Sequence, residues 1–319
     1  MSTSPVAADE LAVQVQGLVH HYGKRQALRG IDLDVRVGEI FALLGPNGGG
    51  KTTLFRILST YLMPSGGSAR VGGHDVVREP DAVRRCLGVL FQSPSLDVQL
   101  TVQENLRYHG FLFGLRGTAL RRRIEASLAR VHLEDRATER VGKLSGGLRR
   151  RAELAKAMLH QPQVLLLDEP STGLDPGARA DLAAALEQLR AEEGITVVLT
   201  THLMDEAEGA DRLAILDEGS VVALGTPAEL KETLGGDVIE VQGPDPEALC
   251  REIRARYGNG VSLINGTVHL ERPRGSETLA ELLPSLTGKI DSVMLRQATL
   301  EDVFLARTGH RFGEDRLET

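Results

Sequence analysis

The residues best suited to chemistry form one glycine-rich segment, Gly45-Pro46-Asn47-Gly48-Gly49-Gly50-Lys51-Thr52. Its spacing fits the pattern G-x-x-x-x-G-K-[ST] of a phosphate-binding loop. Glycines let backbone N–H groups converge on phosphate oxygens, and a helix that begins near Lys51 directs the positive end of its dipole at them. We expect Lys51 to reach the β- and γ-phosphates of a nucleotide and Thr52 to ligate Mg²⁺, with Thr53 beside them. The alternative is a glycine-rich turn without a ligand.

Two adjacent carboxylates follow an apolar run in the segment Val164-Leu165-Leu166-Leu167-Asp168-Glu169. Such a run is typical of a buried parallel strand, and open α/β sheets bind ligands at the carboxyl ends of their strands. Asp168 can hold Mg²⁺ there through its water shell, and Glu169 is placed to polarise an attacking water as a general base. Alone, the pair could be an acidic strand end that starts a loop. The phosphate loop in the same chain favours the chemical roles.

A second turn of small residues, Leu144-Ser145-Gly146-Gly147, stands immediately before an amphipathic stretch. It predicts a second helix N-terminus that can bind an anion. One nucleotide domain does not need two such ends for its own phosphates. We therefore expect this turn to cap the γ-phosphate held by a second subunit, which is either another copy of this chain or a related chain.

Apolar periodicity predicts a mainly parallel α/β sheet with an additional antiparallel layer. Residues 13–15 and 31–35 alternate apolar and polar side chains, which is typical of half-buried strands in an antiparallel sheet. Residues 40–44 and 195–200 are apolar runs of the kind found in strands buried on both faces. Helical stripes are expected at residues 54–62, 101–131 and 182–189, and Thr101 with Glu104 forms a capping box.

Composition excludes several classes of protein. The net charge is −7, from 37 Lys and Arg against 44 Asp and Glu, and the chain has no Trp, 4 Tyr and 7 Phe. Neither the basic footprint nor the stacking surface of a nucleic-acid binder is present. No stretch reaches the roughly 18 apolar residues that a membrane span needs. The N-terminus does not resemble a secretory signal, and two cysteines give no disulfide framework, so we expect a cytosolic protein.

The pattern of predicted strands and helices changes near residue 235, where we place a domain boundary. Beyond it, strand and helix signals follow the order β-α-β-β-α-β of a small ferredoxin-like unit, with a hairpin turn at Asn265-Gly266. We expect a disordered tail at residues 1–10, a nucleotide-binding domain at 11–234 with a helical subdomain at about 93–160, and an α+β domain at 235–319. The basic clusters Arg121–Arg123 and Arg149–Arg151 are interpreted as solvated helix faces.

The sequence resembles the ATP-binding subunits of ABC transporters over about residues 10–230. The phosphate loop, LSGG, LLLDEP, Gly173-Leu174-Asp175 and Thr201-His202 occur in the order and approximate spacing of that family. The resemblance implies an ATPase with the P-loop NTPase fold of the ABC type, which combines a mainly parallel sheet, an antiparallel layer and a helical subdomain.

The resemblance also implies roles for residues outside the phosphate loop. Tyr22 matches the aromatic residue that stacks on adenine, and Gln92 matches the glutamine that senses Mg²⁺ and the attacking water. His202 matches the histidine that contacts the γ-phosphate. Each has a plainer reading: Tyr22 could be a turn aromatic, Gln92 a polar residue at a strand end, and His202 a structural histidine.

Other matched residues belong to a dimer of two such subunits. Ser145 and Gly147, with Gly146 between them, match the residues that contact the γ-phosphate bound to the partner. Asp175 matches the carboxylate that crosses the dimer interface. Because Asp175 precedes Pro176, it is also typical of a helix N-cap with proline at the first helical position, and it can do both jobs.

Two residues depart from the family pattern. Gly49 stands where the family more often has Ala or Ser, which makes the loop more flexible without removing a hydrogen-bond donor. Leu148 stands where many members have Gln after LSGG. Leucine at this position resembles the branch that exports drugs, polysaccharides and metabolites more than it resembles the sugar importers.

The C-terminal run Ala298-Thr299-Leu300-Glu301-Asp302-Val303-Phe304-Leu305 resembles the tail motif of ATPases paired with ABC-2-type export permeases, the daunorubicin-resistance branch of the family. Its residues alone predict a helix start at Thr299 and Asp302 and an apolar anchor at Val303 and Phe304. A terminal helix packed on its own domain gives the same pattern, and the two interpretations are compatible.

We therefore expect an ATPase subunit that dimerises head to tail, as a homodimer, with two ATP molecules between the phosphate loops and the LSGG turns. It would power export through a separate ABC-2-type permease, contacted by residues 93–145, at the cytoplasmic face of the cell membrane. The alternatives are an ABC importer ATPase and a non-transport ABC ATPase that acts on ribosomes or DNA ends. The latter usually needs a second nucleotide domain or a long coiled coil, and 319 residues with one phosphate loop hold neither.

Overall fold

A computed structural model describes residues 10–234, 236–258, 260–310 and 312 of the chain. It divides into two compact units, Met1–Val221 and Val222–Thr319, and the division falls within strand β10 (Ser220–Gly225). The boundary predicted near residue 235 lies later, after helix α8 (Pro227–Glu232), and remains a prediction. The predicted tail, residues 1–10, lies outside the described residues except for Glu10.

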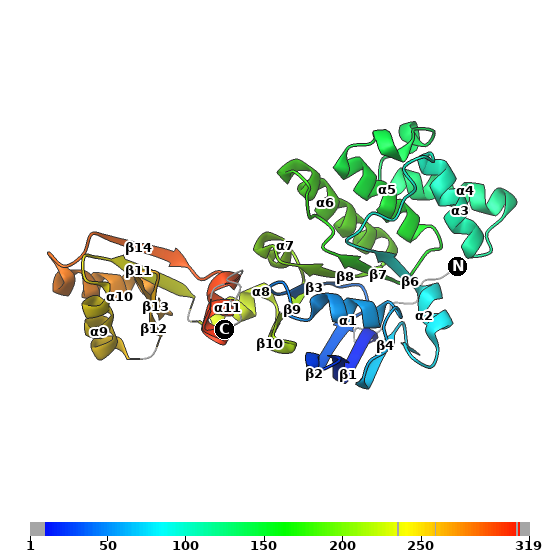
Figure 1. Cartoon of the computed structure of the whole chain (residues 1–319). Coiled ribbons are helices and arrows are strands. Elements are labelled where there is room, and N and C mark those ends of the chain that lie inside the picture. The colour runs from blue at the N-terminus through cyan, green and yellow to red at the C-terminus, as the bar shows by residue number, and fades with distance from the viewer. Residues whose placement is uncertain (1–9, 235, 259, 311, 313–319) are drawn as a thin grey trace. The chain divides into compact units, whose positions relative to one another are not determined.

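A six-stranded sheet runs through the first unit (Figure 1). Its strand order is β10, β9 (Arg212–Asp217), β3 (Ile40–Leu44), β8 (Thr196–Thr201), β7 (Val164–Asp168) and β6 (Leu87–Leu90). The strands from β9 to β6 pair in parallel. Every residue of β3 and β7 is buried, because both faces of the sheet are covered, and this explains their continuous apolar sequences. The predicted α/β class is confirmed.

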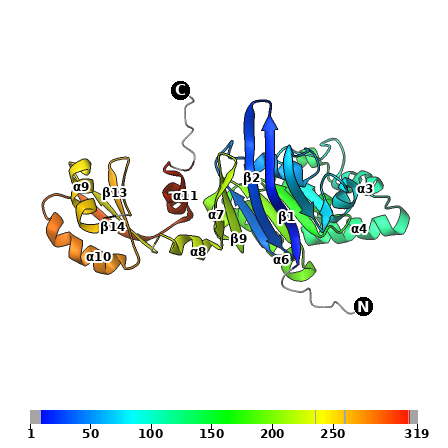
Figure 2. The same cartoon turned by 90° about the horizontal axis from the view of Figure 1, so that it is seen from below.

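An antiparallel sheet forms the expected second layer, in the order β2 (Arg25–Arg36), β1 (Leu11–Tyr22), β4 (Gly66–Val71) and β5 (His74–Asp75). Figure 2 shows β1 and β2 side by side along this layer. Helix α1 (Lys51–Leu58) lies between the two sheets, and its Leu54 and Phe55 join Val13 and Leu166 in one apolar core. The helix that begins at Lys51 is thus fixed by burial on both sides.

The remaining helices of the first unit lie mostly on the other face of the six-stranded sheet (Figure 1). They are α2 (Pro80–Cys86), α3 (Val102–Leu112), α4 (Gly117–Arg130), α5 (Gly146–Met158), α6 (Pro176–Glu193) and α7 (Met204–Glu208), with 3-10 turns at Glu134–Arg136 and Val141–Lys143. The predicted capping box at Thr101 and Glu104 starts α3. The predicted helix 101–131 is two helices, because Gly114 and Gly117 adopt left-handed backbone angles, φ 74° and 57°. Helix α5 packs against α3, α4 and β6.

The second unit contains one antiparallel four-stranded sheet with helices. After α8 come β11 (Asp237–Gln242), α9 (Pro246–Tyr257), β12 (Val261–Ile264), β13 (Thr267–Arg272), α10 (Gly275–Leu282), a 3-10 turn at Leu283–Leu286, β14 (Ser292–Gln297) and α11 (Leu300–Thr308). The sheet order is β12-β13-β11-β14. The order of strands and helices from β11 to β14 is the predicted one. Asn265 and Gly266 make the hairpin turn with φ 48° and 78°, as a two-residue type I′ turn requires.

The C-terminal motif forms an internal polar clamp. Thr299 and Asp302 make a capping box at the start of α11, and the Asp302 carboxylate also accepts two hydrogen bonds from Arg296 of β14, at 2.5 and 2.8 Å. Val303 and Phe304 are fully buried, and α11 packs against α8 of the same unit. Burial raises the pKa of Asp302, but the bonds from Arg296 and Thr299 outweigh burial and hold it below its ordinary value.

We expect Asp302→Asn to lower the free energy of local unfolding of α11 by about 1–3 kcal/mol, the usual contribution of hydrogen bonds to a charged group. Because the folded state lowers the pKa of Asp302, its stabilisation is complete above the unfolded value of about 4 and is lost as pH falls through the folded value. Amide hydrogen exchange of the full chain measures the loss of protection in α11. The exposed neighbour Glu301→Gln is the control, and equal protection in both variants would contradict the clamp.

Candidate active site

The glycine-rich turn joins the buried strand β3 to helix α1. Gly48 and Gly50 adopt left-handed backbone angles, φ 81° and 106°, that residues with a Cβ rarely adopt. A Cβ on Gly45 would stand 2.3 Å from the carbonyl oxygen of Leu216, at the end of β9. On Gly49 it would stand 3.0 Å from the same oxygen. The turn is therefore packed tightly onto the neighbouring strand, and its curvature depends on glycine.

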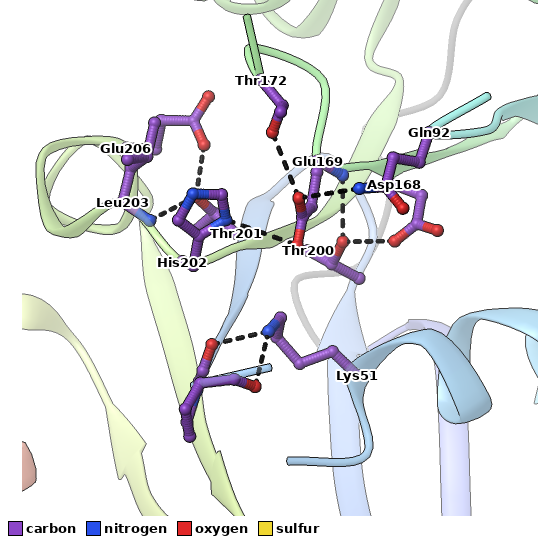
Figure 3. A network of polar contacts seen from close by, with 12 residues as sticks. Lys51, Gln92, Asp168, Glu169, Thr172, Thr200, Thr201, His202, Leu203 and Glu206 are labelled. Atoms are coloured by element: carbon purple, nitrogen blue, oxygen red, sulfur yellow. Dashed lines mark hydrogen bonds and ion pairs between the residues drawn. The ribbon is translucent and has the colours of Figure 1, made fainter. Parts of the chain in front are cut away.

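Lys51 begins α1 and is buried, only 4% exposed. Its Nζ donates hydrogen bonds to the carbonyl oxygens of Gly45, at 2.6 Å, and Pro46, at 2.9 Å (Figure 3). Burial lowers the pKa of Lys51, and the nearby carboxylates of Glu169 and Asp168 oppose that shift. The turn thus holds a desolvated cation close to two carboxylates.

A cavity of about 230 Å³ lies over this turn. Glu169 and Arg56 border it, together with Tyr22 at the end of β1 and Arg25 at the start of β2. The other lining residues are Ala27, Pro46, Asn47, Gly48, Gly50, Lys51, Thr52 and Thr53. The structure therefore brings the predicted adenine-stacking residue, most of the predicted phosphate loop and the predicted general base to one cavity.

Asp168 is the last residue of β7 and is 5% exposed. The hydroxyl of Thr200, on the adjacent strand β8, donates to its Oδ1 at 2.6 Å. Burial raises the pKa of Asp168, and the Thr200 hydrogen bond opposes this shift because it favours the charged carboxylate. A carboxylate, a hydroxyl and an amide oxygen are hard oxygen ligands, so the chemistry of Asp168, Thr52 and Gln92 suits Mg²⁺.

Glu169 follows β7 with a left-handed backbone, φ 46°, which is uncommon for a residue other than glycine. Its N–H donates to the carbonyl oxygen and the hydroxyl of Thr200, at 3.1 and 3.0 Å. Its Oε2 accepts from Gln92 Nε2, at 3.3 Å, and from the Thr172 hydroxyl, at 3.1 Å (Figure 3). The turn of the backbone thus presents the carboxylate to Gln92, which follows β6, and to Thr172 of its own loop.

His202 follows β8, and its Nδ1 lies 3.4 Å from Glu169 Oε1. The preceding Thr201 fixes this corner, because its hydroxyl donates to Glu206 and accepts from the N–H of Leu203 (Figure 3). The predicted catalytic residues Gln92, Glu169 and His202 therefore meet, each from the end of a different parallel strand.

Ser145 and Asp175 lie at two helix N-termini. The Ser145 hydroxyl caps α5 by accepting from the N–H of Leu148, at 3.3 Å, and Asp175 Oδ1 caps α6 by accepting from that of Ala178, at 2.9 Å. A Cβ on Gly147 would lie 3.1 Å from that of Ala178, so the two N-termini are neighbours. The lining of the cavity at Lys51 includes none of the described residues Ser145, Gly146, Gly147 and Asp175.

The sequence did not identify the roles of three residues in this region. Thr172 and Thr200 hold the two carboxylates, and single threonines carry no signal of that role. Arg150 is the third: its cluster was predicted to be a solvated helix face, and this is wrong for Arg150, which is 9% exposed. The small residues Ala152 and Ala155 let α5 pack closely against its neighbours, and the charged Glu153, three residues after Arg150, is buried beside it. That spacing was the available signal.

Comparisons with known proteins show what the chain as a whole is similar to. A family model described as ABC transporter matches residues 28–172. The daunorubicin resistance ATP-binding protein DrrA3 of Streptomyces coeruleorubidus is 40% identical, and the alignment covers 94% of this chain and 96% of that protein. The Nod factor export ATP-binding protein I of Neorhizobium galegae is 39% identical over 95% of this chain and 86% of its own.

Solved structures give the same result for the fold. CbiO1 of Clostridium perfringens, part of the ABC transporter complex cbiONQ, is 27% identical with a TM-score of 0.66, over 78% of this chain and 96% of that one. The ATP-binding cassette MJ0796, a dimer in a post-hydrolysis state bound to ADP and Pi, is 28% identical with a TM-score of 0.60, over 67% of this chain and 98% of that one.

We expect Thr200→Val to raise the pKa of Asp168 further, because it removes the hydrogen bond that stabilises the charged carboxylate. An NMR titration of labelled aspartate carboxyls measures the change. Thr196→Val, a buried threonine at the other end of β8, is the matched control and should leave Asp168 unchanged. A Thr200→Val protein in which Asp168 titrates at or below its original pKa would contradict the electrostatic account.

Proposed function

Because this chain belongs to the family of ABC transporter ATP-binding proteins, we propose that its cavity binds ATP with Mg²⁺, that Glu169 activates the attacking water, and that hydrolysis drives export through a separate permease. The chain is the ATP-binding and hydrolysing subunit of an ABC transporter. The observation that supports the residue roles is the meeting of Gln92, Glu169 and His202 beside the cavity that also holds Lys51 and Tyr22.

The chemistry of the cavity supports ATP as the substrate, in addition to family membership. The N–H groups of the turn and the N-terminus of α1 favour a polyphosphate, Lys51 adds a fixed positive charge, and Tyr22 offers an aromatic face for adenine. Asp168 and Thr52 would hold Mg²⁺, which would neutralise phosphate charge. Catalysis is then positioning and charge stabilisation: Lys51 and His202 act on the phosphate, and Glu169 and Gln92 act on the water.

The positions of Ser145, Gly146, Gly147 and Asp175 support a head-to-tail dimer. These residues lie at the N-termini of α5 and α6 and do not line the chain's own cavity. A second copy, turned head to tail, would supply a phosphate to the N-terminus of α5, where the dipole and free N–H groups favour an anion. The similar cassette bound to ADP and Pi is a dimer, which supports dimerisation of this chain as well.

The segment 93–145 is the proposed contact to the permease. Within the described residues, no helix has both the length and the hydropathy needed to cross a bilayer. Leu112 of α3 is 81% exposed and borders, with His109 and Phe113, a groove of about 580 Å³ next to β6. An exposed apolar side chain beside a groove suits a helix of a membrane partner. Such a contact places the chain at the cytoplasmic face of the membrane, where ATP is available.

The direction of transport follows from the relatives. The similar proteins are named for daunorubicin resistance and for Nod factor export, and the alignments cover nearly the whole of this chain. Export through an ABC-2-type permease is therefore the function proposed for this subunit.

We expect Glu169→Gln to lower ATP turnover by about 10²–10⁴-fold, the usual worth of a general base, because glutamine keeps the shape of the side chain and loses its basicity. ATP binding should remain, and an ATP-bound dimer should accumulate. Phosphate release and size-exclusion chromatography with light scattering measure both. Glu187→Gln, on the exposed surface of α6, is the control and should turn over normally. A Glu169→Gln protein that hydrolyses ATP at the wild-type rate would refute the role of the base.

We expect Ser145→Arg, introduced together with Glu169→Gln, to prevent the ATP-bound dimer while each monomer still binds one ATP, because the defect acts on the partner's nucleotide. Light scattering and equilibrium binding of ATP give the two readouts. Ser145→Ala removes only the helix cap, at a cost of about 1 kcal/mol, and separates loss of the cap from steric blockage. Loss of ATP binding by the Ser145→Arg monomer would show that this turn belongs to the chain's own site.

A further inference from the structure

Arg150, in the second turn of α5, has a buried guanidinium that makes five hydrogen bonds. Nε donates to the carbonyl oxygen of Pro170 at 2.8 Å, and Nη2 donates to those of Asp168 at 3.1 Å and Glu169 at 3.3 Å. Nη1 donates to the carbonyl oxygen of Phe91 and to Glu153 Oε2, both at 2.8 Å. All five guanidinium N–H groups therefore have acceptors.

Four of these bonds end on the two backbone segments that carry the proposed water-activating residues. The carbonyls of residues 168–170 flank Glu169, whose backbone has the uncommon φ of 46°. The Phe91 carbonyl belongs to the residue immediately before Gln92. A left-handed residue persists only where its surroundings hold it, and Arg150 is the cation that does so here. One side chain thus fixes the backbone beneath both Glu169 and Gln92.

Helix α5 holds the loop after Gln92 at a second point. Glu153, paired with Arg150, uses its other oxygen to accept from the N–H of Ser95 at 2.7 Å. One turn further on, Lys156 Nζ donates to the carbonyl oxygen of Ser95 at 3.1 Å and to its hydroxyl. The same face of α5 therefore carries Arg150, Glu153 and Lys156, and all of them bind backbone next to the catalytic segments.

The N-terminus of this helix begins one turn before Arg150. Arg150 is five positions after Ser145, a rise of about 7.5 Å along the axis. A helical segment of this length is stiff, so a rotation or shift of α5 at Ser145 moves the guanidinium with it. Any such movement changes the four hydrogen bonds to carbonyl oxygens, because these bonds, at 2.8–3.3 Å, weaken when their length or angle changes.

We propose that Arg150 is a positioning residue that links the N-terminus of α5, engaged by the partner's nucleotide, to Glu169 and Gln92 of its own chain. The inference rests on the proposed function, which places the partner's γ-phosphate at Ser145 and makes Glu169 the base. In the dimer, a nucleotide in one site then acts through α5 on the base of the other site.

A structural salt bridge would account for only part of this arrangement. A buried pair of Arg150 and Glu153 needs one hydrogen bond between them, and lysine can supply it. The planar guanidinium is required to bond three carbonyls of residues 168–170 and that of Phe91 at the same time. Arg150→Lys therefore keeps the charge next to Glu153 and removes the bridge between segments.

The experiment compares Arg150→Lys with Arg151→Lys, the same chemical change at the next position of α5, where Arg151 pairs with Asp181. We expect Arg150→Lys to lower kcat for ATP by about 10²-fold, the cost of a misplacement of about 1 Å, with unchanged affinity of the monomer for ATP. The loss of buried hydrogen bonds lowers Tm as well, so ATP affinity and dimerisation, measured beside Tm, separate positioning from general destabilisation. Arg151→Lys should retain kcat, because a lysine still pairs with the exposed Asp181.

A second measurement tests whether dimerisation at the N-terminus of α5 affects residues 91–95 and 168–172 through Arg150. In the Glu169→Gln background, ATP should induce the dimer whether or not Arg150 is present as arginine. Hydrogen exchange of peptides covering residues 91–95 and 168–172 should become slower upon dimerisation with arginine at position 150, and should not change with lysine. A purely structural role of Arg150 would instead lower Tm, ATP binding and dimerisation together.

The inference is overturned if Arg150→Lys retains wild-type kcat, or if its peptides gain the same ATP-induced protection. If Arg150→Lys fails to fold, the double variant Arg150→Met with Glu153→Gln removes both buried charges together and is measured in its place. Failure of the proposed function is seen separately: Glu169→Gln alone would then remain active, whatever the result at position 150.

Discussion

The parallel register of β3, β8 and β7 is the constraint on which the site depends. Leu44 pairs with Thr201, and Asp168 pairs with Thr200, so the three strands end at one edge of the sheet. The next residues along each strand are Gly45, His202 and Glu169. A slip of one residue in the pairing of β7 with β8 would turn Thr200 away from Asp168. It would remove the hydroxyl that bonds the Asp168 carboxylate and the backbone N–H of Glu169. The relative positions of the site residues therefore depend on the register of these strands.

This arrangement buries ionisable groups away from water. Burial disfavours the charged forms of both Lys51 and Asp168, and it moves their pKa values in opposite directions. Backbone carbonyls hold the ammonium, and the Thr200 hydroxyl holds the carboxylate. Because these dipoles are fixed by the fold, they need no reorganisation when charge develops on a phosphate. A site of this kind suits a ligand that combines a polyanion with a divalent cation.

The sequence predicted the segments with strong local constraints. Backbone needs identified the glycine turn, periodicity identified the α/β sheet and the antiparallel layer, and capping chemistry identified the start of α3. Arg150 could not be predicted in the same way, because its acceptors are backbone carbonyls of segments 20 and 59 residues away. An arginine run looks solvated unless the folded neighbours are known. The break between α3 and α4 was missed for a local reason, since an apolar stripe continues through Gly114 and Gly117.

The C-terminal motif shows how a sequence signature can report a domain and not a contact surface. Its polar residues Thr299 and Asp302 bond each other, and Asp302 also binds Arg296. Its apolar residues Val303 and Phe304 are fully buried within the same unit. No side chain among these four is left to recognise a partner without unfolding the helix start. The resemblance to export ATPases at this motif therefore reflects the architecture of the unit that α11 closes, and a partner of this unit would have to bind elsewhere on it.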